Sequence, residues 1–135
     1  MVYVLDTNII VKYLRKEIKV HQNFNNAIIQ GDDLVVPKIV DYEIKRGFRI
    51  LSAPNKEAAY KVLTESAGWC GVADMDAGSW ECAENIYADL YQKGLTIGEI
   101  DILIAAFCLK NYYTLVTNNT RHFKDIDGLL LTDWS

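Results

Sequence analysis

Three carboxylates and one amide stand where a side-chain oxygen could bind a metal ion. Asp6 comes directly after the apolar run Val-Tyr-Val-Leu, and Asn119 follows another apolar run near the end of the chain. Glu43 falls inside the apolar arc of the helix predicted over residues 38–51, when successive residues are placed ~100° apart. Asp101 lies in the first turn of an almost wholly apolar helix. A carboxylate on a buried face is costly unless it is paired or bound to a metal.

Oxygen ligands with little histidine favour Mg²⁺ or Mn²⁺ over Zn²⁺. The chain has 3 cysteines, far apart and in no CxxC pair, and 2 histidines. We therefore expect no Cys/His zinc site, and we expect Cys70, Cys82 and Cys108 to be reduced and mostly buried as small apolar residues.

Asp6 and Glu43 also have purely structural interpretations. Asp is a good helix N-cap, although Thr7 and Asn8, which follow Asp6, could cap the same helix. Glu43 is spaced for an i, i+3 ion pair with Arg46, which lies at the margin of the apolar stripe.

The remaining candidates have structural alternatives of the same kind. Glu99 and Asp101 both lie in a first helical turn, where a negative charge interacts favourably with the helix dipole. Residues i and i+2 do not share a helix face, and Asp101 has the more apolar neighbours, so Asp101 is the better inward-facing acid. Asn119 is also a good turn or cap residue.

The elements that must position these side chains alternate along the chain. Short apolar runs predict strands at residues 2–5, 34–36, 71–75, 114–117 and 129–131. The segments between them predict helices at residues 9–15, 21–30, 38–51, 56–67, 77–92 and 99–110. This alternation predicts an α/β fold in which helices cover both faces of a mostly parallel sheet. Ligands bind outside the carboxyl ends of such strands, where Asp6 and Asn119 stand.

Composition limits the class of protein. The chain has 135 residues, of which 50% are hydrophobic and 24% charged, which indicates one globular domain spanning residues 1–135. Its net charge of −4 argues against nucleic-acid binding through a broad basic surface. No apolar run approaches the ~18–20 residues of a membrane span, so no membrane association is expected. Asp6 interrupts the N-terminal apolar segment, which lacks a basic start, so we expect no signal peptide and a cytoplasmic location.

Four segments together resemble the PIN-domain ribonucleases, most closely the VapC-type toxins of toxin–antitoxin pairs. They are LDTNII, YEIKRGF, GEIDILIAA and LVTNNTRHFKDIDGLLLTDW, and they span the chain from Val2 to Trp134 in the expected order. The resemblance implies a single PIN-like domain with a three-layer α/β/α architecture and four to five short strands. Its acidic positions correspond to Asp6, Glu43 and Asp101. Many relatives carry Asp where this chain has Asn119, and this difference affects whether a second metal ion can bind. Glu99 is an auxiliary candidate ligand only.

The resemblance implies a metal-dependent endoribonuclease that hydrolyses RNA phosphodiester bonds with one or two Mg²⁺ or Mn²⁺ ions. Asp6 and Asp101 would be the strongest ligands, with weaker roles for Glu43 and Asn119. Glu43 could instead bind through water or help to deprotonate the nucleophile. The residues proposed to support the ligands by hydrogen bonds are Thr7, Asn8 and Thr117.

The resemblance also bears on partners. Arg121 is expected to contact an RNA phosphate, whereas a solvated basic helix face is the favoured interpretation of Arg46 and Arg49. It implies a cognate antitoxin that can place a basic residue at the carboxylates, and a homodimer. Residues 56–69 could supply the dimer interface or simply pack in the core.

Two other functions fit parts of the sequence. A catalytically weak or silent PIN domain that acts as a binding module is consistent with Asn119. A receiver-like phospho-acceptor domain also has Asp after its first strand, but it needs a second acid beside Asp6 and a Lys after the last strand, and neither is present.

Overall fold

The computed structural model describes residues 1–66 and 70–135. The strands are β1 (Val2–Leu5), β2 (Asp33–Pro37), β3 (Cys70–Ala73), β4 (Thr114–Val116) and β5 (Leu130–Thr132). The helices are α1 (Thr7–Leu14), α2 (Ile18–Ile29), α3 (Lys38–Leu51), α4 (Pro54–Lys61), the π-helical turn η1 (Val62–Ser66), α5 (Ala77–Gln92), α6 (Glu99–Asn111) and α7 (Thr120–Phe123).

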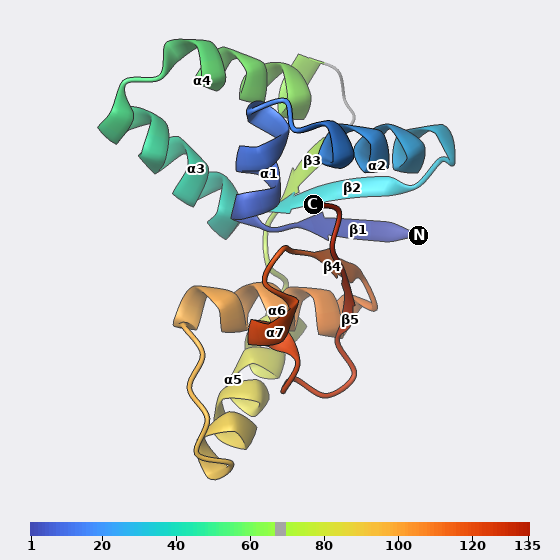
Figure 1. Cartoon of the computed structure of the whole chain (residues 1–135). Helices are drawn as coiled ribbons and strands as arrows, with labels where there is room; N and C mark the ends of the chain where they lie inside the picture. The colour runs from blue at the N-terminus through green and yellow to red at the C-terminus, as the bar shows by residue number, and fades with distance from the viewer. Residues whose placement is uncertain (67–69) are drawn as a thin grey trace.

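The five strands form one parallel sheet in the order β3-β2-β1-β4-β5. Val4 in the central strand lies opposite Val35 of β2 and Leu115 of β4. Figure 1 shows α1 to α4 on the upper side of the molecule and α5 to α7 on the lower side. The predicted α/β architecture, with helices on both faces of a parallel sheet, is confirmed.

The strand order places a reversal between β1 and β4. From β1 the chain proceeds to β2 and β3 on one side, and then crosses to β4 and β5 on the other side. Open parallel sheets bind ligands outside the carboxyl ends of the strands at such a reversal. Receiver-like domains have the order 2-1-3-4-5 instead, so the receiver-like alternative does not match this topology.

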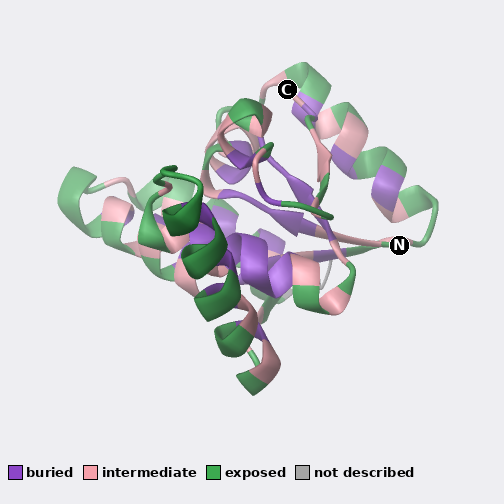
Figure 2. Ribbon diagram, turned by 90° about the horizontal axis from the view of Figure 1, so that it is seen from below, coloured by how far each residue is buried: buried purple, intermediate pink, exposed green. Residues whose placement is uncertain are grey.

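The core lies between the sheet and the two groups of helices. Figure 2 shows the buried residues gathered on the strands and on the helix faces turned toward them. Val4 and Leu5 of β1 and Leu115 and Val116 of β4 are fully buried, so the two strands that meet at the reversal are also the core of the sheet. Helix α6 buries Ala105 and five further residues, as its apolar sequence predicts.

The sequence misplaced some side chains and elements. The helical spacing that puts Glu43 in the apolar arc of α3 also puts Leu51 and Ile50 there, on either side of Val40. Leu51 and Ile50 are nevertheless 76% and 74% exposed, because the last turn of α3 extends beyond the core. The single helix expected over residues 56–67 begins earlier, at Pro54, and changes to η1 after Lys61. The four-residue helix α7 was not predicted, because it is too short to show a hydrophobic period.

Residues 56–69 were expected to form a dimer interface or to pack in the core. In the structure, some of their side chains are buried and others are exposed. Tyr60 and Leu63 are buried in the core, and Val62 is exposed. Ala67 and Trp69, which belonged to the same expectations, lie outside the described residues.

The three cysteines are free thiols. Burial raises the pKa of Cys70 to about 12 and also raises the pKa of Cys108. Among the helices that the structure describes, none is both long and apolar enough to span a membrane.

Candidate functional site

Asp6 lies at the carboxyl end of β1 and caps α1. Its Oδ1 accepts a hydrogen bond of 2.8 Å from the backbone N–H of Thr7. Its Oδ2 accepts a hydrogen bond of 2.8 Å from the hydroxyl of Thr117. Asp6 is therefore a helix N-cap, as its structural interpretation predicted, but capping uses only one of its two carboxylate oxygens. The other oxygen is tied to β4 across the reversal of the sheet.

Thr117 links the ends of the two central strands. Its hydroxyl is fully buried with the rest of its side chain, and it accepts a hydrogen bond of 3.0 Å from the backbone N–H of Asn119 while donating to Asp6. The backbone N–H of Thr117 donates to Thr132 at the end of β5. Thr117 thus fixes Asp6 to the sheet rather than to a flexible loop.

Glu43 reaches the same region from α3. Its Oε1 accepts a hydrogen bond of 3.0 Å from the hydroxyl of Thr7. Thr7 therefore binds Asp6 through its backbone and Glu43 through its side chain, which brings two of the predicted acids together. Arg46, the alternative partner of Glu43, lies instead with its guanidinium 5.2 Å from the ring centre of Tyr42.

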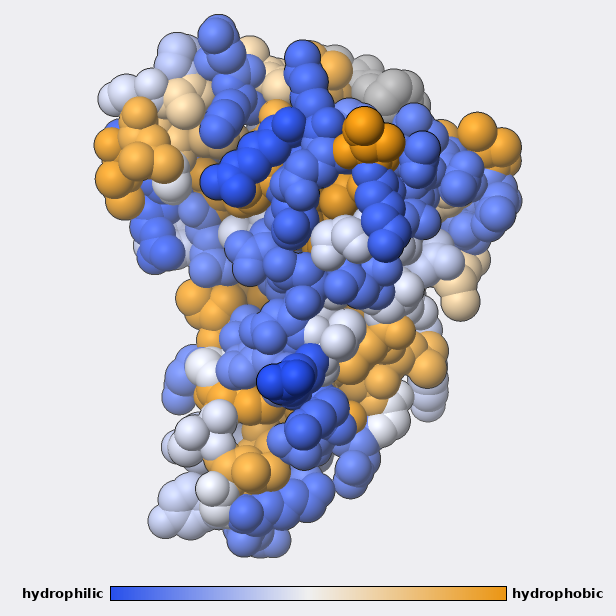
Figure 3. All heavy atoms as spheres, viewed as in Figure 1, coloured by the Kyte–Doolittle hydropathy of each residue, from blue (hydrophilic) through white to orange (hydrophobic). Residues whose placement is uncertain are grey.

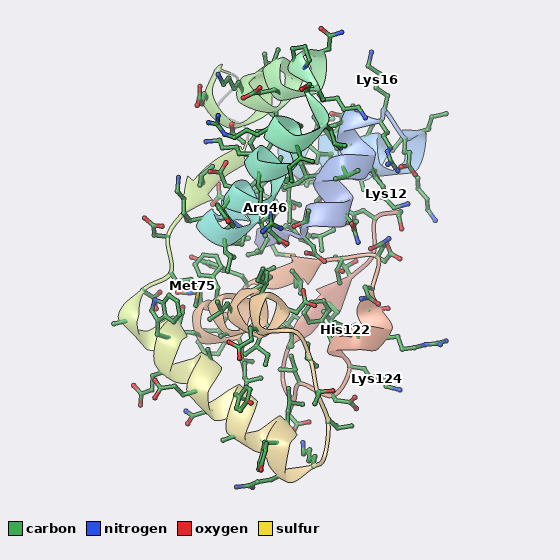
Figure 4. All side chains as sticks on the ribbon, turned by 90° about the vertical axis from the view of Figure 1, so that its left-hand side faces the viewer. Lys12, Lys16, Arg46, Met75, His122 and Lys124 are labelled. Carbon is green, nitrogen blue, oxygen red and sulfur yellow. The ribbon has the colours of Figure 1, made fainter. Side chains whose placement is uncertain are left out.

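Asp101 lies in the first turn of α6 and has a partner that the sequence did not suggest. Its Oδ2 is 2.9 Å from Nε2 of His122, which belongs to α7. Figure 4 shows His122 on the lower side of the gap between the two groups of helices and Arg46 on the upper side. His122 directly follows Arg121 in the sequence. Because the short helix α7 was not predicted, nothing in the sequence indicated that the ring of His122 contacts Asp101.

The charges of this region act on one another. Burial raises the pKa of Asp6 above its ordinary value, because it disfavours the charged form, and the negative charge of Asp101 acts in the same direction. The hydrogen bonds from Thr117 and Thr7 and the positive charge of His122 act against this but do not overcome it. Asp6 is therefore held in a site where its ionised form is short of compensating positive charge.

The other predicted site residues are more peripheral. Glu99 is exposed and lines a cavity of about 380 Å³ with Trp80 and Tyr87, so it faces the groove between α5 and α6. Asn119 is exposed at the N-terminus of α7, and its backbone, not its side chain, contacts Thr117. Asn8 and Arg121 are also exposed. The structure thus links Asp6 and Glu43 through Thr7, and the charge of Asp101 acts on the pKa of Asp6.

The available oxygens fit a cation that keeps part of its water shell. Each Asp6 oxygen accepts one of the hydrogen bonds given above, whereas a carboxylate has about four acceptor positions, so capacity remains for a metal ion. Within residues 1–66 and 70–135, no group of three or more Asp, Glu, His or Cys side chains converges closely enough to hold a metal alone. Mg²⁺ usually takes one or two carboxylates and several waters, so this donor set suits it.

Asp41, a second acid of α3, received no role from the sequence. It is 2% exposed and accepts a hydrogen bond of 2.7 Å from the hydroxyl of Tyr60. Lys45 and Lys38 lie 3.2 Å and 3.4 Å from its Oδ2. Burial acts to raise the pKa of Asp41, but the bonds from Tyr60 and the two lysines together lower it. This cluster joins α3 to α4 and so fixes the helix that carries Glu43.

Comparisons with known proteins identify what this chain is similar to. The model of the PIN domain family matches residues 3–129. Ribonuclease VapC2 of Rickettsia felis is 31% identical over 134 residues, which cover 99% of this chain and 98% of that protein. The tRNA(fMet)-specific endonuclease VapC of Shigella flexneri is 30% identical, with 98% of each chain covered.

Solved structures show the same likeness. VapBC2 from Rickettsia felis, bound to a DNA fragment from their promoter, contains a chain with a TM-score of 0.85 and 29% identity, and all of both chains is covered. DNA-bound VapBC from Salmonella typhimurium gives a TM-score of 0.84 and 25% identity, with 100% of this chain and 99% of that chain covered.

Proposed function

Because this chain belongs to the PIN domain family, we propose that it is a metal-dependent endoribonuclease of the VapC type, the toxin of a toxin–antitoxin pair. The observation that carries the proposal is the joining of Asp6, Thr7 and Glu43 at the reversal of the sheet, with Asp101 near enough to raise the pKa of Asp6. The ribonuclease and endonuclease names of its full-length relatives support the same activity.

Asp6 and Asp101 are the proposed ligands of Mg²⁺ or Mn²⁺, in one or two ions, with Asn119 and Glu99 as auxiliary oxygen donors. A bound divalent ion would offset the charge of the phosphate and lower the pKa of a coordinated water. The hydrogen bonds of the protein already orient one of the proposed ligands. Thr7 and Thr117 fix both oxygens of Asp6, so the side chain needs no rearrangement when a cation binds.

Glu43 is the proposed proton acceptor for the water that attacks phosphorus. The hydroxyl of Thr7 occupies Oε1 and orients the carboxylate. The other oxygen, Oε2, takes the proton as the new bond from water to phosphorus forms. The bond from phosphorus to one ribose oxygen breaks, and that oxygen takes a proton from solvent water. Glu43 is only half buried, which leaves this side of the site accessible to RNA.

Basic side chains lie on both groups of helices. Figure 4 shows Arg46 and Lys12 on the upper group of helices and His122 and Lys124 on the lower group. Figure 3 shows hydrophilic residues over much of the upper group of helices and along the middle of the lower group. The side chains of Arg46, Lys12 and Lys124, together with Arg121 of α7, are proposed to contact RNA phosphates, which would explain how a chain of net charge −4 binds an anionic substrate.

The proposed partners are a cognate antitoxin and a second copy of the chain, in the cytoplasm. Relatives were solved as VapBC complexes, which supports a VapB-like partner. The grooves beside α5 and α6 offer a partner apolar contacts, with cavities of about 520 Å³ and 380 Å³ that share Trp80 and Leu103. A basic residue of the antitoxin would pair with Asp6 and Asp101.

The activity is tested by incubating purified protein with several structured RNAs at rising Mg²⁺ and Mn²⁺. Initiator tRNA is included because the Shigella flexneri relative is named for it. Wild type should cleave RNA only with metal, and Asp6→Asn should not. Asp76→Asn is the matched control, because Asp76 caps α5 as Asp6 caps α1 but lies outside the site. Equal inactivity of wild type and Asp6→Asn at saturating metal would refute the enzyme and leave the binding-module alternative that Asn119 suggests.

A further inference from the structure

Within residues 1–66 and 70–135, the side chain of Asp101 makes one hydrogen bond, and its partner is His122. The distance between His122 Nε2 and Asp101 Oδ2 is 2.9 Å, and each side chain is 33% exposed. An ionised carboxylate offers only acceptors, so Nε2 must carry the hydrogen in this contact. The bond therefore occupies Oδ2 and leaves Oδ1 for another partner.

The ring of His122 is itself held in place. Its backbone N–H donates to the carbonyl of Asn119 over 3.0 Å, which forms the turn of α7. The imidazole lies edge-on to the ring of Phe123, with 5.5 Å between ring centres and an angle of 85° between the planes. Phe123 is 1% exposed, so α7 is fixed to the core immediately beside the histidine.

This placement joins the two halves of the site. The hydroxyl of Thr117 accepts a hydrogen bond from the backbone N–H of Asn119 and donates one to Asp6. His122, three residues after Asn119, contacts Asp101. Residues 117–123 thus contact both Asp6, which follows β1, and Asp101 on α6. The charges of Asp101 and His122 also act on the pKa of Asp6, in opposite directions.

We propose that His122 is a positioning residue, which holds Asp101 through Oδ2 so that Oδ1 is presented to the divalent cation. The inference rests on the proposed function, because it assumes that Asp101 is a ligand. Hydrogen bonds to a ligating side chain restrict its orientation, and their loss weakens metal affinity by about 10–100-fold. If the contact between these partly exposed side chains were only structural, its loss would leave metal binding unchanged.

The test compares metal binding in four proteins, without RNA. Free Mn²⁺ is measured by electron paramagnetic resonance during titration of wild type, His122→Leu, His122→Gln and His21→Leu. Gln can donate an amide hydrogen from the equivalent position, whereas Leu keeps bulk and loses the donor. His21 is the matched control: its Nε2 also makes a hydrogen bond of 2.8 Å, but to the carbonyl of Tyr13, near the other end of α1 from Asp6. Circular dichroism establishes that each variant is folded.

His122→Leu should bind Mn²⁺ about 10–100-fold more weakly than wild type, His122→Gln should recover most of that loss, and His21→Leu should match wild type. In RNA cleavage, His122→Leu should need more metal for half-maximal rate while its KM for RNA stays unchanged. Equal Mn²⁺ affinity of wild type and His122→Leu would overturn the proposal, as would a His122→Gln variant as weak as His122→Leu.

These results separate the inference from the function on which it rests. If wild type cleaves RNA with metal and His122→Leu binds Mn²⁺ normally, the function stands and the positioning role fails. If the variants show the expected order of Mn²⁺ affinity but no tested RNA is cleaved, the positioning role stands and the ribonuclease fails. A wild-type protein that binds no Mn²⁺ contradicts both.

Discussion

Removal of one hydroxyl, by Tyr60→Phe, tests the buried cluster that fixes α3 beneath the site. Tyr60 is fully buried, and its hydroxyl donates a hydrogen bond of 2.7 Å to Oδ1 of the buried Asp41. Phe keeps the ring and its packing against Phe48, so the hydrogen bond is the only interaction lost. A hydrogen bond to a charged group contributes about 1.5–3 kcal/mol to the free energy of unfolding.

The corresponding change in Tm follows from the size of the chain. With an unfolding entropy of about 2.1 cal/mol/K per residue, 135 residues give about 0.28 kcal/mol/K, so the Tm of Tyr60→Phe should fall by about 5–11 °C. Thermal unfolding followed by circular dichroism measures it. Tyr91→Phe, at a tyrosine that is 76% exposed, is the control and should leave the Tm unchanged.

The pH dependence gives a second check on the same bond. The pKa of Asp41 in the folded protein lies below its ordinary value of 3.8, so its ionised interactions stabilise the fold above pH 3.8. They are lost as the pH falls through the lower, folded pKa. The difference between wild type and Tyr60→Phe should therefore shrink below pH 3.8 in urea unfolding. A Tyr60→Phe protein as stable as wild type at pH 7 would refute the reasoning.

Two further substitutions test the site itself. Asp6→Asn should raise the Tm of the metal-free protein at pH 7, because the raised pKa of Asp6 means that its ionised form costs stability. This difference in Tm should disappear below pH 3.8, where Asp6 is neutral in both the folded and the unfolded protein. Addition of Mg²⁺ should raise the Tm of wild type but not that of Asp6→Asn. A Tm of Asp6→Asn equal to or below that of wild type at pH 7 contradicts the electrostatic account. Thr7→Val should lower kcat for RNA by about tenfold or more, because Glu43 loses the hydroxyl that orients it, and Thr7→Ser should restore the rate. Equal kcat values for Thr7→Val and Thr7→Ser would show that the hydroxyl has no role.

The sequence was sufficient for features that depend on periodicity. Alternating short strands and helices predicted the parallel α/β sheet, and the bounds predicted for α3 and α5 match those observed. The i, i+2 spacing of Glu99 and Asp101 predicted that the two acids face different ways, and in the structure Glu99 lines the groove beside α5 while Asp101 contacts α7. The proposed catalytic roles of these residues stay predictions.

Contacts between distant segments could not be predicted in this way. The bond between Thr7 and Glu43 depends on how α3 packs against α1, which no local pattern encodes. His122 belongs to a helix of one turn, too short for a periodic signal. Asp41 is charged and flanked by lysines, which is typical of a surface residue, and only the position of Tyr60 explains its burial.

The most direct test of the account is the single-turnover rate of RNA cleavage as a function of Mn²⁺ concentration, for wild type and Asp101→Asn. We expect a wild-type rate that rises with Mn²⁺, disappears with a chelator and returns when the ion is restored. Asp101→Asn should be at least about 100-fold slower at the same Mn²⁺, and Asp127→Asn, an exposed acid paired with Lys93, should match wild type. Cleavage that persists in chelator, or equal rates for wild type and Asp101→Asn, would contradict the central claim that these carboxylates bind the catalytic metal.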